Sequence, residues 1–456
     1  MTVSISRRIS FEVLRRVEAE SAYASDLLHA ELGESVKAAD AALATELTMG
    51  VLRWRRLLDS LLERHLKKPV ERLDLPVALA LRMGAYQLRF LKRIPPRAAV
   101  NESVELVKSA RKASAAALVN AVLRRVADEA GSPAEKFLPA GIAPAERLAT
   151  LHSHPTWIVE RWLARFGEAQ TTTLLEADNR TPRLSCAVND AGRRDEIEAE
   201  LEKQGLKIES GLLLKAAFSV SGGSVARTQA FRSGRIAIQD EASQMVPLLL
   251  GVREGDRVLD LCAAPGGKTP TLLRAAGREG ITIAADRHFH RVRAMQAQFK
   301  RLGLANAHLV VLDATRPLPF RDSFDRILVD APCSGTGTLA RHPEIRWRLR
   351  AEQLSEFHQL QCALLRSAVA HLAPGGTLVY STCSIEPEEN EAVVAETMQS
   401  AAAIRRAPAI ELAALLQPHL SPKANATALF AYDGYFRTSP AIHHTDGFFA
   451  AVLQKK

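Results

Sequence analysis

The sequence predicts an α/β protein whose doubly wound, mostly parallel sheet is preceded by an all-helical domain and a small α+β domain. Three observations lead to this prediction. Five β-rich runs after residue 250 alternate with helical stretches, a pattern typical of parallel sheets. A glycine turn joins the first of these runs to a helix. Before residue 130, apolar residues recur at three- and four-residue intervals, and strand signals are nearly absent.

The all-helical domain is expected over residues 1–140. Phe11, Leu14 and Val17 are three residues apart, as on one face of a helix. The same mixed spacing recurs in residues 41–66, 77–91 and 115–126. Prolines punctuate these segments at Pro69, Pro76, Pro95 and Pro96. Residues 131–144 hold three prolines and two glycines, so we expect a linker there.

The small α+β domain is expected over residues 150–230. Residues 184–189 and 212–220 have the composition of strands, and they flank a helix predicted over residues 194–204. This arrangement predicts a βαβ-like piece. The sheet domain then follows over residues 231–456.

The sheet domain is organised around the run Val258-Leu-Asp-Leu-Cys-Ala-Ala-Pro-Gly-Gly-Lys268. A short apolar strand turns through Pro265, Gly266 and Gly267 into a helix. Glycine lets a backbone approach a ligand closely, and the new helix presents unpaired N–H groups. The turn matches neither the dinucleotide fingerprint nor the Walker loop. By itself it therefore indicates either a ligand site or an ordinary strand–helix turn.

Later strands also end in residues that carry chemistry. Asp286, Asp313 and Asp330 each end a β-rich run, and Cys333 and Cys383 lie at two of the strand ends. An acid at the tip of the second strand commonly accepts hydrogen bonds from ribose hydroxyls. Any one of these acids is better explained as a helix cap or turn residue. Because the carboxyl ends of parallel strands share one edge, the five together predict a single cleft.

Two of the five cysteines are candidates for chemistry. Pro332 favours an extended chain, so Asp330 and Cys333 are expected to follow one another without a turn. A thiolate can add to an electrophilic ring carbon while a neighbouring acid protonates the ring. Cys333 and Cys383 fit that chemistry. The others are expected to pack as small hydrophobes: Cys186, Cys262 and Cys362.

The net charge of +9 is concentrated in one region. Residues 51–125 hold 17 Lys and Arg against 6 Asp and Glu, whereas residues 1–50 hold 5 against 8. Each cluster alone is typical of a solvated helix face, but their sum indicates contact with nucleic-acid phosphates. The clusters are Arg53, Arg55 and Arg56; Lys67 and Lys68; Lys92, Arg93 and Arg97; Lys108, Arg111 and Lys112; and Arg124 and Arg125.

The sequence also indicates a compartment. The odd number and wide spacing of the cysteines, with no C-x-x-C pair, fit a reducing cytoplasm better than a disulfide scaffold. We expect no signal peptide and no membrane span. His443 and His444 form an isolated pair, so we expect no metal site. No obligatory protein partner is indicated.

Several motifs, taken in order, resemble the Sun/Fmu family of RNA (cytosine-5) methyltransferases. The helical region resembles the NusB-like RNA-binding domain of one branch, ribosomal small-subunit methyltransferase B. The resemblance implies a Rossmann-like class I methyltransferase fold and methylation of cytosine C5 in 16S rRNA. The motifs are residues 258–268, Asp286, Asp313, residues 330–337, 341–347, 380–390 and 446–449.

The resemblance also implies a cofactor, S-adenosylmethionine, and the residues that hold it. Asp286 is expected to hold the ribose hydroxyls and Asp313 to lie by the adenine. Arg291 is a supporting charge, and Asp330 is expected near both the methyl donor and the target base. The methionine part is expected against Cys262, Ala263, Ala264, Pro265, Gly266, Gly267 and Lys268.

In the implied mechanism Cys383 is the nucleophile that adds to C6 of cytosine. Asp330 protonates or hydrogen-bonds N3, and Cys333 assists removal of the C5 proton. DNA cytosine-5 methyltransferases place the nucleophile in the Pro-Cys motif, which would select Cys333, and spacing does not decide between the two thiols. The alternatives are the same reaction on tRNA or another RNA, and a non-catalytic RNA-binding ribosome assembly factor. The role of residues 287–290 stays open.

The implied partner is small-subunit rRNA, bound through the basic N-terminal domain and the catalytic cleft. Its target base must leave the stack to be reached, so single-stranded or loop RNA is expected.

Overall fold

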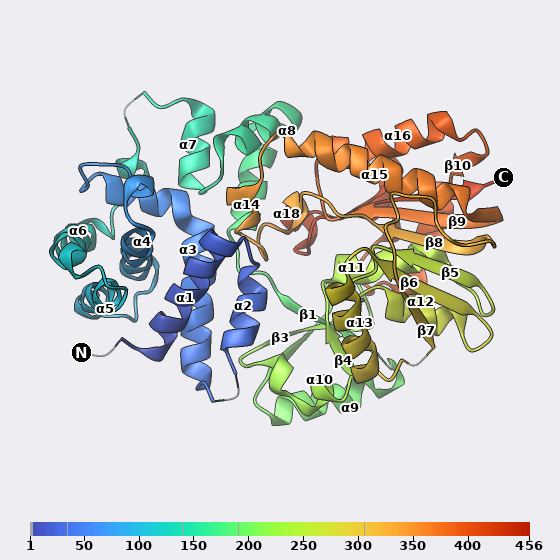
Figure 1. The fold of residues 1–456 in the computed structure, drawn as a ribbon, viewed down its shortest axis with the longest axis horizontal. Helices are drawn as coiled ribbons and strands as arrows, with labels where there is room; N and C mark the ends of the chain where they lie inside the picture. Colours follow the sequence, from blue (N-terminus) through green and yellow to red (C-terminus); the bar gives the residue numbers. More distant parts are fainter. Residues whose placement is uncertain (1–2, 34, 140, 190, 305) are drawn as a thin grey trace. The chain divides into compact units, whose positions relative to one another are not determined.

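The computed structural model describes residues 3–33, 35–139, 141–189, 191–304 and 306–456, and Figure 1 shows the fold. The chain forms two compact units. The helical unit holds the residues up to Thr181 together with a second segment, Leu339–Leu349. The sheet unit holds Pro182–Thr338 and Arg350–Lys456.

The helical unit is built around one apolar core. Helix α4 (Leu75–Phe90) is buried from Val77 to Gln87 and packs against its neighbours α1, α3, α5 and α6. Gly84 lets α4 come close to α6, because a Cβ there would lie 2.4 Å from a methyl carbon of Leu123. The other helices are α1 (Ile5–Glu20), α2 (Ala24–Glu31), α3 (Ala38–Glu63), α5 (Pro96–Ser109), α6 (Ala116–Glu129), α7 (Pro144–Leu151) and α8 (Thr156–Asp178).

The expected all-helical domain is confirmed. Two of the prolines that punctuate its segments lie at the starts of helices. Pro76 and Pro96 lie in the first turns of α4 and α5, where the missing N–H costs no hydrogen bond. No helix in the described part of the chain is long and apolar enough to cross a membrane.

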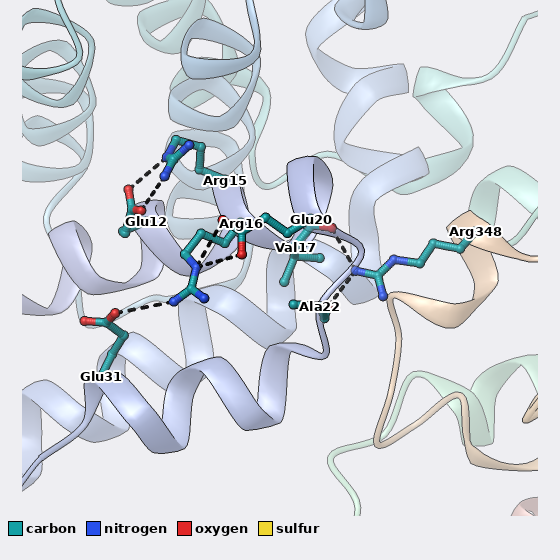
Figure 2. A network of polar contacts seen from close by, with 8 residues as sticks. All are labelled: Glu12, Arg15, Arg16, Val17, Glu20, Ala22, Glu31 and Arg348. Atoms are coloured by element: carbon teal, nitrogen blue, oxygen red, sulfur yellow. Dashed lines mark hydrogen bonds and ion pairs between the residues drawn. The ribbon is translucent and has the colours of Figure 1, made fainter. Parts of the chain in front are cut away.

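The segment Leu339–Leu349 is separated from the rest of the helical unit by more than 150 residues of sequence, yet it is anchored there by hydrogen bonds. It contains the short helix α14 (Ile345–Arg348). The indole N–H of Trp347 donates to the Leu52 carbonyl at 2.6 Å. Arg348 donates to the carbonyls of Val17 and Ala22 at the C-terminal end of α1, at 2.8 and 2.6 Å (Figure 2).

Arg348 therefore supplies donors where the last carbonyls of α1 have no helical partner. Ion pairs also involve α1: Arg15 pairs with Glu12 and Arg16 with Glu20 on the helix itself, and Arg16 also pairs with Glu31 at the end of α2 (Figure 2).

The small sheet of the sheet unit is antiparallel, which corrects the predicted βαβ-like piece. Its order is β2-β3-β1-β4, and β1 pairs antiparallel with both β3 and β4. Helix α9 (Arg194–Lys203) packs Ile197 and Leu201 against this sheet. The strands are β1 (Leu184–Val188), β2 (Lys207–Ser210), β3 (Ala217–Ser221) and β4 (Ile236–Ile238).

The prediction missed the edge strand β2 because most of its residues are exposed, so it lacks an apolar alternation. The strand predicted over residues 212–220 also starts too early. In the structure this strand begins at Ala217, and Leu214 forms only an isolated bridge to Leu420. The predicted limits 1–140, 150–230 and 231–456 also differ from the compact units. β4 lies beyond residue 230, and residues 150–181 belong to the helical unit.

The main sheet is mostly parallel, as predicted, and has the order β10-β12-β9-β8-β5-β6-β7, with β11 paired to β12. Strands β5 to β9 run parallel, and β12 adds to β9 antiparallel. The strands are β5 (Arg257–Leu261), β6 (Ile281–Asp286), β7 (Ala307–Val311), β8 (Phe324–Asp330), β9 (Leu372–Thr382), β10 (Ile404–Arg406), β11 (Phe436–Arg437) and β12 (Phe449–Lys455).

Helices cover both faces of the main sheet, which makes it doubly wound (Figure 1). One core joins α15 (Gln353–Ala370) and α16 (Glu391–Ser400) to the strands. Another core joins α12 (Thr269–Ala276) and α17 (Ala409–Leu416) to them. Helix α13 (Phe289–Arg301) packs beside β6 and β7.

Candidate active site

The candidate site lies at the carboxyl ends of β5, β6, β8 and β9. The chain leaves β5 toward β6 on one side, and β8 pairs with β5 on the other. Such a reversal of strand order opens a crevice at the strand ends, where ligands bind in open α/β sheets.

The glycine turn after β5 adopts a backbone that only small residues tolerate. Gly266 has a φ of +92°, and a Cβ there would lie 2.7 Å from Phe299 and 2.8 Å from Met295. Cys262 has a φ of +62°. Any side chain at position 266 would push α13 away, so glycine is required for the turn to pack closely.

Asp286 and the turn are joined by Arg291. The Asp286 carboxyl is 4% exposed and accepts a hydrogen bond from the backbone N–H of His288 at 2.9 Å. Arg291 lies 3.5 Å from the other carboxyl oxygen and donates to the Ala264 carbonyl at 2.8 Å. Arg291 therefore joins the acid at the tip of β6 to the glycine turn.

Asp313 lies two residues beyond β7, and its side chain is more exposed than that of Asp286. Its carboxyl accepts hydrogen bonds from the N–H and hydroxyl of Thr315, and the hydroxyl bond lowers its pKa. Arg287 approaches it at 3.8 Å, while the neighbouring Phe289 side chain is exposed. Part of the open question about residues 287–290 is thus answered: Arg287 faces Asp313 and the His288 backbone binds Asp286.

Asp260, the last residue but one of β5, is a buried carboxyl with one oxygen that accepts no hydrogen bond from the described residues. Oδ2 accepts a hydrogen bond from Thr269 at 2.7 Å, whereas Oδ1 has no partner among the described residues. Burial raises the pKa of Asp260 to about 7. An acceptor left unpaired in a low-dielectric site favours a cationic or donor group of a ligand.

Lys268 connects the glycine turn to β8 and β9. Its ammonium lies 2.5 Å from Oδ2 of Asp330 and 5.2 Å from the ring centroid of Phe448. Oδ1 of Asp330 accepts a hydrogen bond from the Ser381 hydroxyl at 2.7 Å. Asp330 is therefore fixed in place by donors from two separate elements.

The two candidate cysteines meet. The Sγ atoms of Cys333 and Cys383 lie 3.2 Å apart, and both thiols are free. The hydrogen bond to Cys383, together with burial, raises the pKa of the Cys333 thiol well above its ordinary value. Cys186 and Cys362 are buried away from this pair, as expected for small hydrophobes.

The loop after Cys333 is held by a close glycine pair. Gly337 donates to the Cys383 carbonyl at 2.9 Å, and Gly447 donates to the Gly337 carbonyl at 2.7 Å. A Cβ on Gly337 would lie only 2.1 Å from the carbonyl oxygen of Gly447. A Cβ on Gly447 would lie 2.9 Å from the Cα of Gly337, which explains why the motif near the C-terminus contains a glycine next to its two phenylalanines.

Sequence reasoning missed the residue at the centre of this loop region, Glu389. It lies within the motif over residues 380–390, but three glutamates occur there and no pattern marks which one binds the residues beside the cysteines. In the structure Glu389 is 0% exposed and binds residues next to both cysteines.

Three side chains of metal-binding types also come together, from α15 and α16: His358, Cys362 and Glu396. Both carboxyl oxygens of Glu396 already have protein partners, since His358 and Arg366 each lie 3.0 Å away. These contacts account for the cluster as an ion pair that joins the two helices.

The predicted basic clusters fall into two groups. Arg53 is buried and donates to the Ala340 carbonyl at 3.0 Å, and Arg56 binds the His154 carbonyl at 2.8 Å, so this cluster is structural. Arg55 pairs with Glu18 and lies over the Trp347 ring. The exposed basic residues are Lys67, Lys68, Lys92, Arg93, Arg97, Lys108, Arg111, Arg124 and Arg125.

Known proteins resemble every part of this arrangement. A family model described as 16S rRNA methyltransferase RsmB/F matches residues 247–454. A NusB family model matches residues 4–128, and a model of the RsmF/B-like ferredoxin-like domain matches residues 154–223. The probable ribosomal RNA small subunit methyltransferase B of Bacillus subtilis is 33% identical over 454 residues, covering 99% of this chain and 98% of that protein. The chain belongs to the RsmB/F family of 16S rRNA methyltransferases.

Other members of the family are similarly related. The ribosomal RNA small subunit methyltransferase B of Klebsiella pneumoniae is 34% identical, over 93% of this chain and 92% of that protein. The crystal structure of a methyltransferase homolog protein from Pyrococcus horikoshii has a TM-score of 0.57 and 29% identity, covering 69% of this chain and all of that one. The family predicted from the motifs is confirmed, as is the NusB-like helical domain.

Proposed function

We propose that this RsmB/F-family enzyme transfers the methyl group of S-adenosylmethionine to C5 of a cytosine in 16S rRNA, through a covalent bond between Cys383 and C6. The observation that carries the proposal is the contact between the thiols of Cys333 and Cys383, 3.2 Å apart at the ends of β8 and β9. Asp330, the last residue of β8, belongs to the same strand end. Two thiols and an acid suffice for addition, proton transfer and release.

The residues at the strand ends fit S-adenosylmethionine, which supplies an activated methyl group when bound. The unpaired oxygen of Asp260 suits a cationic group, and the buried carboxyl of Asp286 suits the ribose hydroxyls. The turn from Cys262 to Lys268 would hold the methionine part, since Gly266 allows close approach. Asp313 would lie by the adenine.

Arg291 supports this site by joining Asp286 to the Ala264 carbonyl. Its guanidinium would keep the turn and the ribose-binding acid at a constant separation.

Catalysis begins with the Cys383 thiolate. It forms a bond to C6 of cytosine, and the electrons of the C5–C6 double bond move toward N3, which makes C5 nucleophilic. Asp330 protonates N3 or donates a hydrogen bond to it as charge develops there. Lys268 and Ser381 fix the Asp330 carboxyl in place for this task.

Cys333 completes the reaction after C5 has been methylated. While Cys383 is a thiolate, the hydrogen bond between the two sulfurs keeps Cys333 a thiol, which agrees with the raised pKa of Cys333. Once the Cys383 sulfur is bonded to C6, its charge is gone and Cys333 can lose its proton to water. The Cys333 thiolate then takes the C5 proton; the C5–H electrons re-form the double bond, the C6–S electrons return to Cys383, and N3 gives its proton back to Asp330.

Asp286→Asn is expected to weaken S-adenosylmethionine binding about ten- to a hundredfold, because hydrogen bonds to a charged group contribute roughly 1.5–3 kcal/mol. Isothermal titration calorimetry measures the dissociation constant. Asp322→Asn, an exposed aspartate of the same unit, is the matched control. Equal affinities for both variants would remove Asp286 from the cofactor site.

We propose that the exposed basic residues of the helical unit bind rRNA phosphates. Reversing Lys92, Arg93, Arg97 and Arg124 to Glu should weaken RNA binding and flatten its dependence on salt, by about 0.7–0.9 in the log–log slope per lost phosphate contact. Filter binding at several salt concentrations measures both quantities. Reversing Arg253, Arg278, Arg321 and Lys423, four exposed residues of the sheet unit, controls for net charge. An unchanged slope in the four-residue variant would exclude this surface.

A further inference from the structure

Glu389 is a buried carboxylate that receives four hydrogen bonds. Oε1 accepts from the backbone N–H of Ser334 at 2.7 Å and from the side-chain amide of Gln361 at 3.1 Å. Oε2 accepts from the hydroxyls of Ser334 and Ser384. Four donors are what two carboxylate oxygens can accommodate, and they offset the cost of burying the charge.

These bonds tie together the two loops that carry the cysteines. Ser334 follows Cys333, and Ser384 follows Cys383. Gln361, on α15, also donates to the Pro332 carbonyl at 2.9 Å, so the Cys333 loop is held on both sides of the thiol by groups that bind Glu389.

The two loops depend on Glu389 to different degrees. Cys383 directly follows β9, and its neighbours have a second anchor in Asn390. The Thr382 hydroxyl donates to Asn390 at 2.5 Å, and Asn390 donates to the Ser384 carbonyl at 2.9 Å. Cys333 lies three residues beyond the end of β8. Ala331 before it donates to the Ser381 carbonyl at 2.8 Å, but the backbone N–H and the hydroxyl of Ser334 after it both donate to Glu389. Loss of Glu389 would therefore displace Cys333 more than Cys383.

We infer that Glu389 is a positioning residue that holds the Cys333 thiol where this thiol can remove the C5 proton. Glu389 therefore contributes to the release of the methylated base and not to the attack of Cys383 on C6. The inference rests on the proposed function. In the step it supports, Cys333 sulfur gains the C5 proton, the C5–H electron pair becomes the second C5–C6 bond, and the Cys383 sulfur leaves with the C6–S pair.

The test compares Glu389→Ala with Cys333→Ala in the full chain, incubated with S-adenosylmethionine and 16S rRNA and run on a denaturing gel. Glu389→Ala is expected to accumulate the same denaturant-resistant adduct as Cys333→Ala. Its turnover should fall about a hundredfold, as expected when a reacting group moves by about 1 Å. The affinities for cofactor and RNA should stay unchanged.

Glu389→Gln is the conservative variant. Its amide oxygen can still accept from the Ser334 N–H and Gln361, and the two serine hydroxyls can rotate to accept from its NH₂ group. It should restore turnover to within about tenfold of the unmodified protein, since neutral hydrogen bonds contribute about half as much as charged ones. Glu396→Gln, the same change at a surface ion pair, should leave turnover and adduct level unaltered.

The outcomes separate this inference from the proposed function. Adduct in Cys333→Ala but none in a Glu389→Ala protein that binds both ligands would overturn the role of Glu389 alone. No adduct in Cys333→Ala would overturn the proposed mechanism itself. If Glu389→Ala does not fold, Ser334→Ala, which removes one of the four donors, takes its place. Adduct in that variant supports the inference, and its absence overturns it.

Discussion

Cys383→Ala protein is expected to lose methyl transfer by about 10⁴-fold or more, because removing the nucleophile of a covalent mechanism removes its first step. The S-adenosylmethionine affinity should stay unchanged, since Cys383 belongs to the cysteine loops and not to the glycine turn. Incorporation of a labelled methyl group into 16S rRNA measures the loss. Cys186→Ala, a change at a buried cysteine of the small sheet, is the matched control.

The Cys333→Ala variant gives the complementary result. In this variant Cys383 should still form the bond to C6 of the cytosine, but the methylated RNA should not be released from the protein. A denaturing gel with S-adenosylmethionine and, in separate reactions, 16S rRNA and tRNA is expected to show adduct with rRNA for Cys333→Ala only. Adduct with tRNA would keep the mechanism and change the substrate. Adduct only in Cys383→Ala would exchange the roles of the two cysteines. Absence of any adduct would favour a non-catalytic RNA-binding factor.

Arg346→Leu is expected to destabilise the helical unit by about 3–5 kcal/mol. Arg346 is fully buried, and its guanidinium donates to the carbonyls of Ser153 and Asp178 at 3.0 and 3.2 Å. It also binds the Arg53 and Leu339 carbonyls and the Asn179 amide oxygen. Leucine fills much of the space but leaves these acceptors buried without donors, which costs about 1–3 kcal/mol for each one that water does not reach.

Urea unfolding followed by tryptophan fluorescence isolates this effect. The protein has four tryptophans, Trp54, Trp157, Trp162 and Trp347, and all of them belong to the helical unit. Arg350→Leu, the same change at an exposed arginine just beyond the segment, should shift the midpoint little. A shift for Arg346→Leu no larger than for Arg350→Leu would mean that the segment Leu339–Leu349 adds little to the stability of the helical unit.

Local sequence patterns predicted the five parallel strands of the main sheet, whose central members are largely buried, but not β10, β11 and β12. Asp286 and Asp330 were predicted to end two β-rich runs, and they are the last residues of β6 and β8. Such strands are continuous apolar runs between turn residues, so they are visible without knowledge of their neighbours. The exposed edge strand β2 has no such run, and its absence from the prediction turned an antiparallel sheet into a βαβ-like piece.

The topology of the sheet accounts for part of the arrangement at the candidate site. The convergence of strand ends placed Asp286, Asp330, Cys333 and Cys383 at one edge, because parallel strands leave no other arrangement. The sequence did not indicate which of the basic residues are exposed. Arg53 and Arg56 look the same as Arg93 or Arg124 in composition, yet the first two donate to carbonyls inside the helical unit.

The sequence by itself determined the doubly wound sheet, the glycine turn, the two cysteines and the family, since each depends on residues close together in the chain or on short motifs. Only the tertiary structure decided that Glu389 joins the two cysteine loops and that Arg346, some 165 residues beyond the end of the first segment, belongs to the helical unit. Both are buried charges whose donors or acceptors come from distant parts of the chain. Burial of a charge is tolerated only when those partners are in place, and no local pattern records where they come from.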